Sequence, residues 1–254
     1  MKPFRPKILR YDSLPSTNTE AARLAMQGAA EGLAVIADEQ TAGRGRLQRS
    51  WLSPKGAGLY STILFRPKLA VDRWPLMTFM ASLAVNDALV EASEVTTDIK
   101  WPNDLLAGER KICGILAEAI ETETGRAVVV GIGINLTPDA YPRELALVAT
   151  SIAEASGHPP NKERILASLL QALGRWYSLL SEPEGGEKIV AAWSSRSTYA
   201  NGKSVSVLNG DETWQGVTRG VESDGALRLE TEDKEIRLIR AGDVSVRSVR
   251  LTTQ

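Results

Sequence analysis

The sequence contains a single cysteine, Cys113, and a single histidine, His158. One cysteine excludes an internal disulfide and a cysteine-based metal cluster, and it fits the reducing conditions of the cytoplasm. Because His158 is alone and lies in a Gly-His-Pro-Pro loop segment, it supports no Ser-His-Asp or Cys-His catalytic arrangement and no histidine-based metal site. Cys113 lies in an apolar segment, where the expected role is that of a small core residue.

An excess of charge of either sign is absent, and so are long hydrophobic runs. Lys and Arg number 30 and Asp and Glu number 31, which gives a formal net charge of −1. General nucleic-acid binding rests on a surplus of Lys and Arg, so this balance argues against it. No apolar run approaches the ~20 residues that span a bilayer, and residues 1–10 lack the apolar core of a signal peptide. These features predict a soluble cytoplasmic protein.

The 254 residues exceed the usual size of one domain and favour a large domain followed by a small one. Helical spacing of apolar residues predicts helices that begin near Thr17 and that cover 74–91, 165–180 and 189–193. Short apolar or alternating runs predict strands at 33–37, 58–65, 98–101, 111–116 and 127–131. Strands and helices do not alternate regularly, so the expected class is α+β with a mixed sheet and flanking helices.

The pattern changes near residue 200. Hairpin signals at Asn209-Gly210-Asp211 and Asp224-Gly225 separate short alternating strands. About fifty residues of short strands with tight turns suggest a small β-barrel of SH3-like size. The expected division is therefore a large domain at 1–197 and a β-barrel domain at 198–254.

The most unusual segment alternates glycine and arginine and contains Gly43, Arg44, Gly45, Arg46 and Arg49. Glycine lacks a Cβ and can adopt positive φ, so this backbone can fold tightly around a ligand and present its N–H groups. Guanidinium groups are permanently charged and match phosphate and carboxylate oxygens. By itself the pattern is as typical of a basic turn or a nucleic-acid patch as it is of a ligand-binding loop. In a chain without net positive charge, it favours a site for one anionic ligand.

Two further segments combine polar and charged residues. Ser16-Thr17-Asn18 is typical of a helix N-terminus, with Thr17 and Glu20 spaced as a capping box, and such an end can also bind polar ligand groups. Lys100-Trp101-Pro102-Asn103-Asp104 is typical of a turn at a strand end. Its Asp104 is also the kind of carboxylate that holds Mg²⁺ near phosphates.

Lys111 begins a strand that is otherwise apolar. If its side chain points inward it needs an anionic partner, because an unpaired buried ammonium is costly; at a strand end it can instead reach water. Glycines in Gly131-Ile132-Gly133-Ile134-Asn135 allow close approach of a ligand. This strand lacks the third glycine of a dinucleotide-binding fingerprint, and the sequence has no Walker A motif.

Together and in this order, these segments resemble the biotin protein ligases, which attach biotin to carrier-protein lysines. The similarity covers roughly residues 10–250. It rests on Ser16-Thr17-Asn18, Gln40, Gly43-Arg44-Gly45-Arg46, Arg49, Trp51, Ser53-Pro54, Gly58-Leu59-Tyr60, Lys100-Trp101-Pro102-Asn103-Asp104, Lys111, Gly114-Ile115-Leu116 and Gly131-Ile132-Gly133-Ile134-Asn135. The resemblance implies a class II synthetase-like catalytic domain followed by an SH3-like β-barrel. Because the first motif lies near the N-terminus, it also implies a monofunctional ligase without the DNA-binding domain of some bacterial members.

In this family, the carboxylate of biotin attacks the α-phosphate of ATP, and a carrier lysine then attacks the resulting biotinyl-5′-AMP. The resemblance assigns catalysis to Lys111, Arg46 and Asp104, with Mg²⁺ assisting and its ligands not identified. Asp104 acts on the metal or on the acceptor lysine. The biotin-binding residues implied are Ser16, Thr17, Asn18, Gln40, Gly43, Arg44, Arg46, Trp51, Lys111 and Gly114. The nucleotide-binding residues implied are Arg44, Arg46, Arg49, Trp51, Asn103, Lys111 and Asn135.

Three alternatives remain. Lipoate or octanoate enzymes share the fold, but the Gly-Arg-Gly-Arg and Lys-Trp-Pro-Asn-Asp segments point to biotin. Near-zero net charge opposes a nucleic-acid-binding protein, and retention of Lys111 and the arginines opposes a non-catalytic biotin sensor. The expected partner is a biotin carboxyl carrier domain of a carboxylase, with neither DNA nor membrane. An exposed strand edge near 128–130 offers a weak route to a homodimer.

Overall fold

The computed structural model describes residues 6–209 and 212–240. The strands of the large sheet are β1 (Lys7–Leu14), β2 (Leu33–Gln40), β3 (Gly58–Phe65), β4 (Asp98–Lys100), β5 (Asp104–Ala107), β6 (Arg110–Thr122) and β7 (Gly125–Asn135). The helices are α1 (Thr17–Met26), α2 (Leu76–Ser93), α3 (Ile152–Ser156), α4 (Lys162–Leu180) and α5 (Gly185–Ser194). A second sheet contains β8 (Asn201–Asn209), β9 (Glu212–Val221), β10 (Leu227–Thr231) and β11 (Ile236–Ile239).

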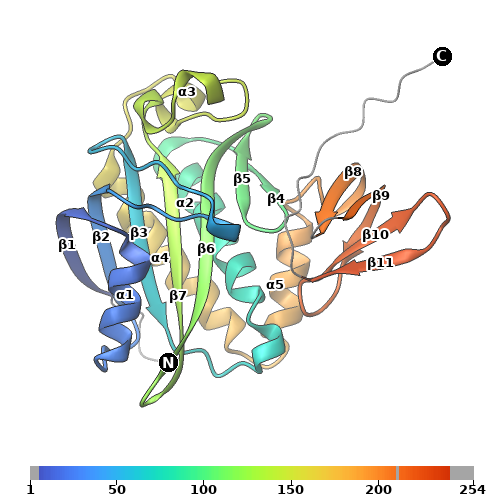
Figure 1. The fold of residues 1–254 in the computed structure, drawn as a ribbon, viewed down its shortest axis with the longest axis horizontal. Coiled ribbons are helices and arrows are strands. Elements are labelled where there is room, and N and C mark those ends of the chain that lie inside the picture. Colours follow the sequence, from blue (N-terminus) through green and yellow to red (C-terminus); the bar gives the residue numbers. More distant parts are fainter. Residues whose placement is uncertain (1–5, 210–211, 241–254) are drawn as a thin grey trace.

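The large sheet is mixed and has the strand order β1-β2-β3-β7-β6-β5-β4. β1 and β2 run parallel and are joined by α1, whereas the other neighbouring strands are antiparallel. At the centre of the sheet, β6 and β7 form a long ladder (Figure 1). Its register sets Gly114 opposite Gly133. This register leaves a small area of the sheet surface without side chains.

Helices cover both faces of the large sheet (Figure 1). Side chains alternate along β2, so that Ala34 and Ile36 face the core beneath α2, whereas Leu33 and Val35 pack with α1. α2 is buried on most of its surface because it lies between the sheet, α4 and α5. None of the described helices has both the length and the apolar character needed to cross a membrane.

The second sheet is an antiparallel meander in the order β11-β10-β9-β8. Its inward residues, including Val205 and Leu229, join the main hydrophobic core. Trp101, which is 2% exposed, donates a hydrogen bond from Nε1 to the carbonyl oxygen of Gly225 at 2.9 Å. This bond links the turn after β4 in the large sheet to the loop between β9 and β10 in the second sheet. The predicted barrel thus appears as a four-stranded sheet, while residues 210–211 and 241–254 lie outside the described part. The predicted division after residue 197 falls between α5 and β8 and stays a prediction.

The predicted elements are largely confirmed, with local differences. β3 covers the predicted residues 58–65, and α1, α2 and α4 lie where apolar spacing indicates. The predicted capping box at α1 is wrong. Ser16 precedes the helix without a side-chain cap, and Glu20 binds Tyr11 and Arg23 instead. Tertiary partners therefore replace the local cap.

The strand edge suggested near 128–130 is also wrong. These residues lie in β7, which pairs with β3 on one side and β6 on the other. All of them are buried, as a continuous apolar run in a central strand requires. Within the described residues, the edges of the large sheet are β1 and β4, so the proposed route to a homodimer is lost.

Candidate active site

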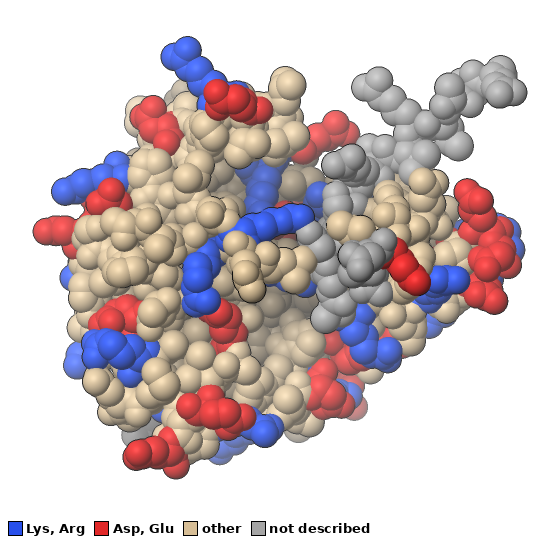
Figure 2. All heavy atoms as spheres, viewed as in Figure 1, with Lys and Arg blue, Asp and Glu red and all other residues tan. Residues whose placement is uncertain are grey.

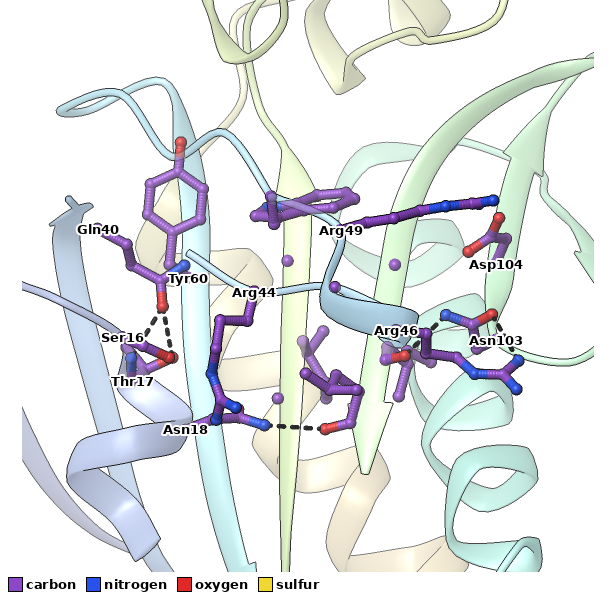
Figure 3. A pocket seen from close by; sticks show the side chains of 18 of the residues that line it. Ser16, Thr17, Asn18, Gln40, Arg44, Arg46, Arg49, Tyr60, Asn103 and Asp104 are labelled. Carbon is purple, nitrogen blue, oxygen red and sulfur yellow. Dashed lines mark hydrogen bonds between the residues drawn. The ribbon is translucent and has the colours of Figure 1, made fainter. Parts of the chain in front are cut away.

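A cavity of about 220 Å³ lies on the α1 side of the large sheet (Figure 3). The predicted site residues that line it are Ser16, Thr17, Asn18, Gln40, Arg44, Arg46, Arg49, Trp51, Asn103, Asp104, Lys111 and Gly114. Two predicted residues, Gly43 and Asn135, lie outside the lining. The fold therefore brings segments that are distant in sequence to one place.

Gln40, at the end of β2, connects the start of α1 with the loop that precedes β3. Its Oε1 accepts hydrogen bonds from Thr17 N at 2.8 Å and from Thr17 Oγ1 at 3.0 Å (Figure 3). Its Nε2 donates to Ser53 Oγ at 2.8 Å, and Ser53 Oγ donates to the Trp51 carbonyl oxygen. These neutral groups make the part of the cavity around Gln40 polar but uncharged.

Asn18 is fixed in one orientation by hydrogen-bond partners from two strands, β3 and β6. Its Oδ1 accepts from Thr62 Oγ1 at 2.7 Å, while its Nδ2 donates to the Leu116 carbonyl oxygen at 3.2 Å and to Glu118 Oε2 at 2.7 Å. With both N–H groups engaged, Oδ1 is the atom that can meet a ligand donor. Thr62 and Glu118 lie in no recognisable sequence motif, so the sequence alone does not identify them as residues of the site.

Glycines of β6 and β7 keep the floor of the cavity free of side chains. A Cβ on Gly114 would lie 2.9 Å from the Trp51 ring, and one on Gly133 would lie 2.5 Å from Trp51 Nε1. A Cβ on Gly131 would lie 2.0 Å from Asn18 Oδ1. The indole of Trp51 therefore lies close to the sheet, and its buried N–H has no hydrogen-bond partner in the structure. The side chains of Asn18 and Trp51 make the close approach at Gly131 and Gly133, and the close approach of a ligand there stays a prediction.

Residues 43–51, called the lid below, form a two-armed hairpin. Trp51 N donates to the Gly43 carbonyl oxygen at 2.9 Å, and Gly45 N donates to that of Arg49 at 2.6 Å. A Cβ on Gly43 would lie 2.3 Å from the Trp51 carbonyl oxygen. Glycine is therefore required there because the two arms approach so closely.

Positive φ angles in the lid occur at its tip and not at its glycines. Gly45 has φ of −108°, whereas Leu47 and Gln48 have φ of 53° and 59°. Gly43 therefore contributes through its lack of a Cβ and not through a positive φ. Each left-handed non-glycine residue costs roughly 1–2 kcal/mol, so the ordered lid carries backbone strain at its tip.

The lid arginines extend in different directions (Figure 3). Arg44 forms an ion pair with Glu118 at 2.9 Å, and Arg46 makes a long contact of 3.5 Å with Asn103 Oδ1. Arg49 extends toward Asp104 in the close-up view. Figure 2 shows Lys and Arg side chains gathered across the middle of this face of the molecule.

Lys111 has the anionic partner that an inward orientation requires. Its Nζ lies 2.7 Å from Asp104 Oδ1 and 5.2 Å from the centroid of the Trp51 ring. The contact with Asp104 is a close ion pair without the alignment of a directed hydrogen bond. Burial lowers the pKa of nearby Lys100; the charge of Asp104 opposes this and that of Lys111 adds to it.

Asn103 and Asn135 have different positions. Asn103 donates from Nδ2 to the Ile115 carbonyl oxygen at 2.9 Å, which fixes the segment before β5 against β6. Asn135 is 4% exposed and donates from Nδ2 to the Thr150 carbonyl oxygen at 2.9 Å. The ligand contacts assigned to both asparagines stay predictions.

The charges of the lining are strongly unequal. Five cationic side chains, Arg44, Arg46, Arg49, Lys100 and Lys111, face a cavity to which Asp104 contributes the one carboxylate among the described lining residues. No cluster of three His, Cys, Asp or Glu side chains suited to a metal ion occurs in the described part of the chain. The cavity is therefore suited to an anionic ligand at the lid end and a neutral polar ligand at the α1 end.

Comparison with known proteins gives the same picture. Residues 11–135 match the biotin/lipoate A/B protein ligase family, and residues 201–247 match the biotin protein ligase C-terminal domain. The chain is 36% identical over 246 residues to the bifunctional ligase/repressor BirA of Bacillus subtilis, covering 94% of this chain and 74% of that protein. It is 37% identical over 220 residues to the biotin–[acetyl-CoA-carboxylase] ligase of Paracoccus denitrificans, covering 84% and 90%.

A solved structure supports the same relationship. The biotin protein ligase of Aquifex aeolicus, in complex with biotin and ATP, has a TM-score of 0.82 and 30% sequence identity, and the match covers 95% of this chain and 99% of that one. The chain belongs to the biotin/lipoate A/B protein ligase family and, within it, to the biotin protein ligases.

Proposed function

We propose that the cavity binds biotin at its α1 end and the phosphates of ATP at its lid end, and that it joins them as biotinyl-5′-AMP. The observation that carries this proposal is the environment of Lys111. Its ammonium lies beside Asp104 and over the Trp51 ring, in a cavity with one neutral polar end and one cationic end. The Aquifex relative, which is described in complex with biotin and ATP, supports the same ligand pair.

Biotin needs donors and acceptors for its ureido group within an otherwise apolar slot. At the α1 end, Ser16, Thr17 and Gln40 supply hydroxyl and amide groups, and Asn18 supplies an acceptor through Oδ1. The Trp51 ring forms an apolar wall above the glycine floor. This arrangement directs the biotin carboxylate away from α1 and toward Lys111.

In the first step, a carboxylate oxygen of biotin forms a bond to the α-phosphorus of ATP, and pyrophosphate leaves. Two anions must approach each other, and fixed cations lower that electrostatic cost. Lys111 is the group that contacts both reacting anions. Arg44, Arg46 and Arg49 neutralise the phosphates, and the closed lid keeps water from the mixed anhydride.

In the second step, the amine of an acceptor lysine attacks the biotinyl carbonyl carbon, the bond to AMP breaks, and the amine loses a proton. Asp104 is the carboxylate of the described lining and the residue available to take that proton. Mg²⁺ commonly binds one or two carboxylates and substrate phosphates, so Asp104 together with ATP fits this metal. When bound, Mg²⁺ would supply additional positive charge at the phosphates.

The acceptor is proposed to be a lysine of a biotin carboxyl carrier domain. Relatives from Paracoccus denitrificans and Mycobacterium tuberculosis are named biotin–[acetyl-CoA-carboxylase] ligases, which supports a carboxylase as the source of that domain. The cytoplasm is the proposed compartment, because the single cysteine needs no oxidising environment.

The direct test is isotope exchange between pyrophosphate and ATP in the presence of biotin, lipoate or neither. Exchange that depends on biotin, followed by transfer to a carrier domain, is the expected result. Exchange with lipoate or octanoate alone would instead favour the related activity of the same family. Exchange in the absence of biotin, lipoate and octanoate would refute adenylation of biotin as the function.

A further inference from the structure

Glu118 of β6 makes two contacts that join separate parts of the site. Its Oε2 accepts a hydrogen bond from Asn18 Nδ2 at 2.7 Å and another from an Arg44 terminal nitrogen at 2.9 Å. One residue comes from the start of α1 and the other from the lid. The carboxylate therefore connects the neutral end of the cavity with the first lid arginine.

A second ion pair on the same strand shows what an ordinary surface contact looks like. Glu121 pairs with Arg126 at 2.7 Å, and their side chains are 78% and 52% exposed. That pair lies within the β6–β7 hairpin and contacts no residue of the cavity. Glu118 is 28% exposed and joins residues that lie 74 and 100 positions away in sequence.

The Glu118 contacts have a geometric consequence for Arg44. Asn18 is already held by Thr62 and by the Leu116 carbonyl oxygen, so it gives Glu118 a rigid neighbour. Glu118 in turn holds one nitrogen of the Arg44 guanidinium, and the remaining N–H groups stay available for an anion. An arginine held in this way loses less conformational entropy when it binds a ligand.

We propose that Glu118 is a positioning residue that holds Arg44 and the root of the lid in the geometry used to bind the biotinyl adenylate. This inference rests on the proposed function. Glu118 touches neither Lys111 nor Asp104 in the described contacts, so it acts on ligand retention and leaves the chemical step unchanged. A charge-assisted hydrogen bond of this kind contributes enough to change ligand retention about tenfold.

The test compares Glu118→Ala and Glu118→Gln with Glu121→Ala as the matched control. In biotin-dependent pyrophosphate exchange, Glu118→Ala is expected to raise the biotin KM and the adenylate dissociation rate about tenfold. Its kcat at saturating biotin is expected to change by less than about twofold. Glu118→Gln keeps an acceptor oxygen and should recover part of the loss, while Glu121→Ala should match the parent protein.

A double-mutant cycle with Arg44→Gln tests whether the two residues act together. If Glu118 acts through Arg44, the double variant should be no worse than the more severe single variant. Effects that multiply, or a biotin KM for Glu118→Ala equal to that for Glu121→Ala, would overturn the proposal. If the alanine variant fails to fold, the glutamine variant and the cycle still decide the question.

A readout without catalysis separates this inference from the proposed function. Trypsin cleaves after arginine, so cleavage after Arg44 in the ligand-free protein reports how firmly the lid root is held. Cleavage should be about tenfold faster in Glu118→Ala and unchanged in Glu121→Ala. Equal rates in the two variants would contradict positioning by Glu118, whether or not the parent protein activates biotin.

Discussion

Replacing Lys111 with alanine should remove the main electrostatic support for adenylation. Two unit charges about 4 Å apart interact by about 4 kcal/mol at an effective dielectric constant of about 20. The Lys111 side chain is 32% exposed and pairs with Asp104, and both facts reduce the net effect. We expect a loss of about 3 kcal/mol, which corresponds to about 150-fold in the rate of adenylate formation.

The assay is single-turnover formation of biotinyl-5′-AMP, with thermal unfolding measured in parallel. The pair of Lys111 with Asp104 is partly exposed, so its removal should change the free energy of unfolding by less than about 1 kcal/mol. Lys162→Ala is the control, because Lys162 pairs with Asp38 at the same distance of 2.7 Å outside the cavity. Near-normal adenylate formation in Lys111→Ala, or an equal loss in Lys162→Ala, would contradict an electrostatic role for Lys111 in adenylation.

Other variants test the roles of the lid, the glycine floor and the buried thiol. Arg46→Gly removes a cation and the contact with Asn103, and adenylate dissociation followed by stopped flow should be about tenfold faster. Gly133→Ala places a methyl group 2.5 Å from Trp51 Nε1, and calorimetry should show biotin binding weakened at least about tenfold. Gln48→Gly relieves a left-handed residue and should slow adenylate release about fivefold, since about 1 kcal/mol of strain is removed. Unchanged rates or affinity would contradict each assignment. Burial raises the pKa of the Cys113 thiol, so iodoacetamide at neutral pH should label it only after unfolding; rapid labelling of the folded protein would contradict that burial.

Sequence patterns predicted the buried elements better than the exposed ones. β3 was predictable because residues 58–65 are β-rich and end before Pro67. β1 was missed, since its residues are mostly exposed and lack a clear apolar alternation. The apolar run at 128–130 indicated a strand, but its central place depends on pairing with β3 and β6, which local sequence does not encode.

The segments of the site were predictable, but their contacts were not. Gln40 and Lys111 stand in recognisable motifs, and both line the cavity. Thr62 and Glu118 have no motif, and their partner Asn18 lies far away in sequence, so only the folded chain brings them together. The strained lid tip at Leu47 was likewise unpredictable, because positive φ is expected at glycines and not at leucine.

Retention of biotinyl-5′-AMP by the protein shows whether Lys111 drives adenylation in this cavity. The protein would be incubated with biotin and Mg-ATP in the absence of a carrier, and its mass then measured under native conditions. We expect one biotinyl-5′-AMP bound per chain, and its loss in Lys111→Ala. Binding of biotin and ATP without formation of the adenylate, or an adenylate formed equally well by Lys111→Ala, would contradict this expectation.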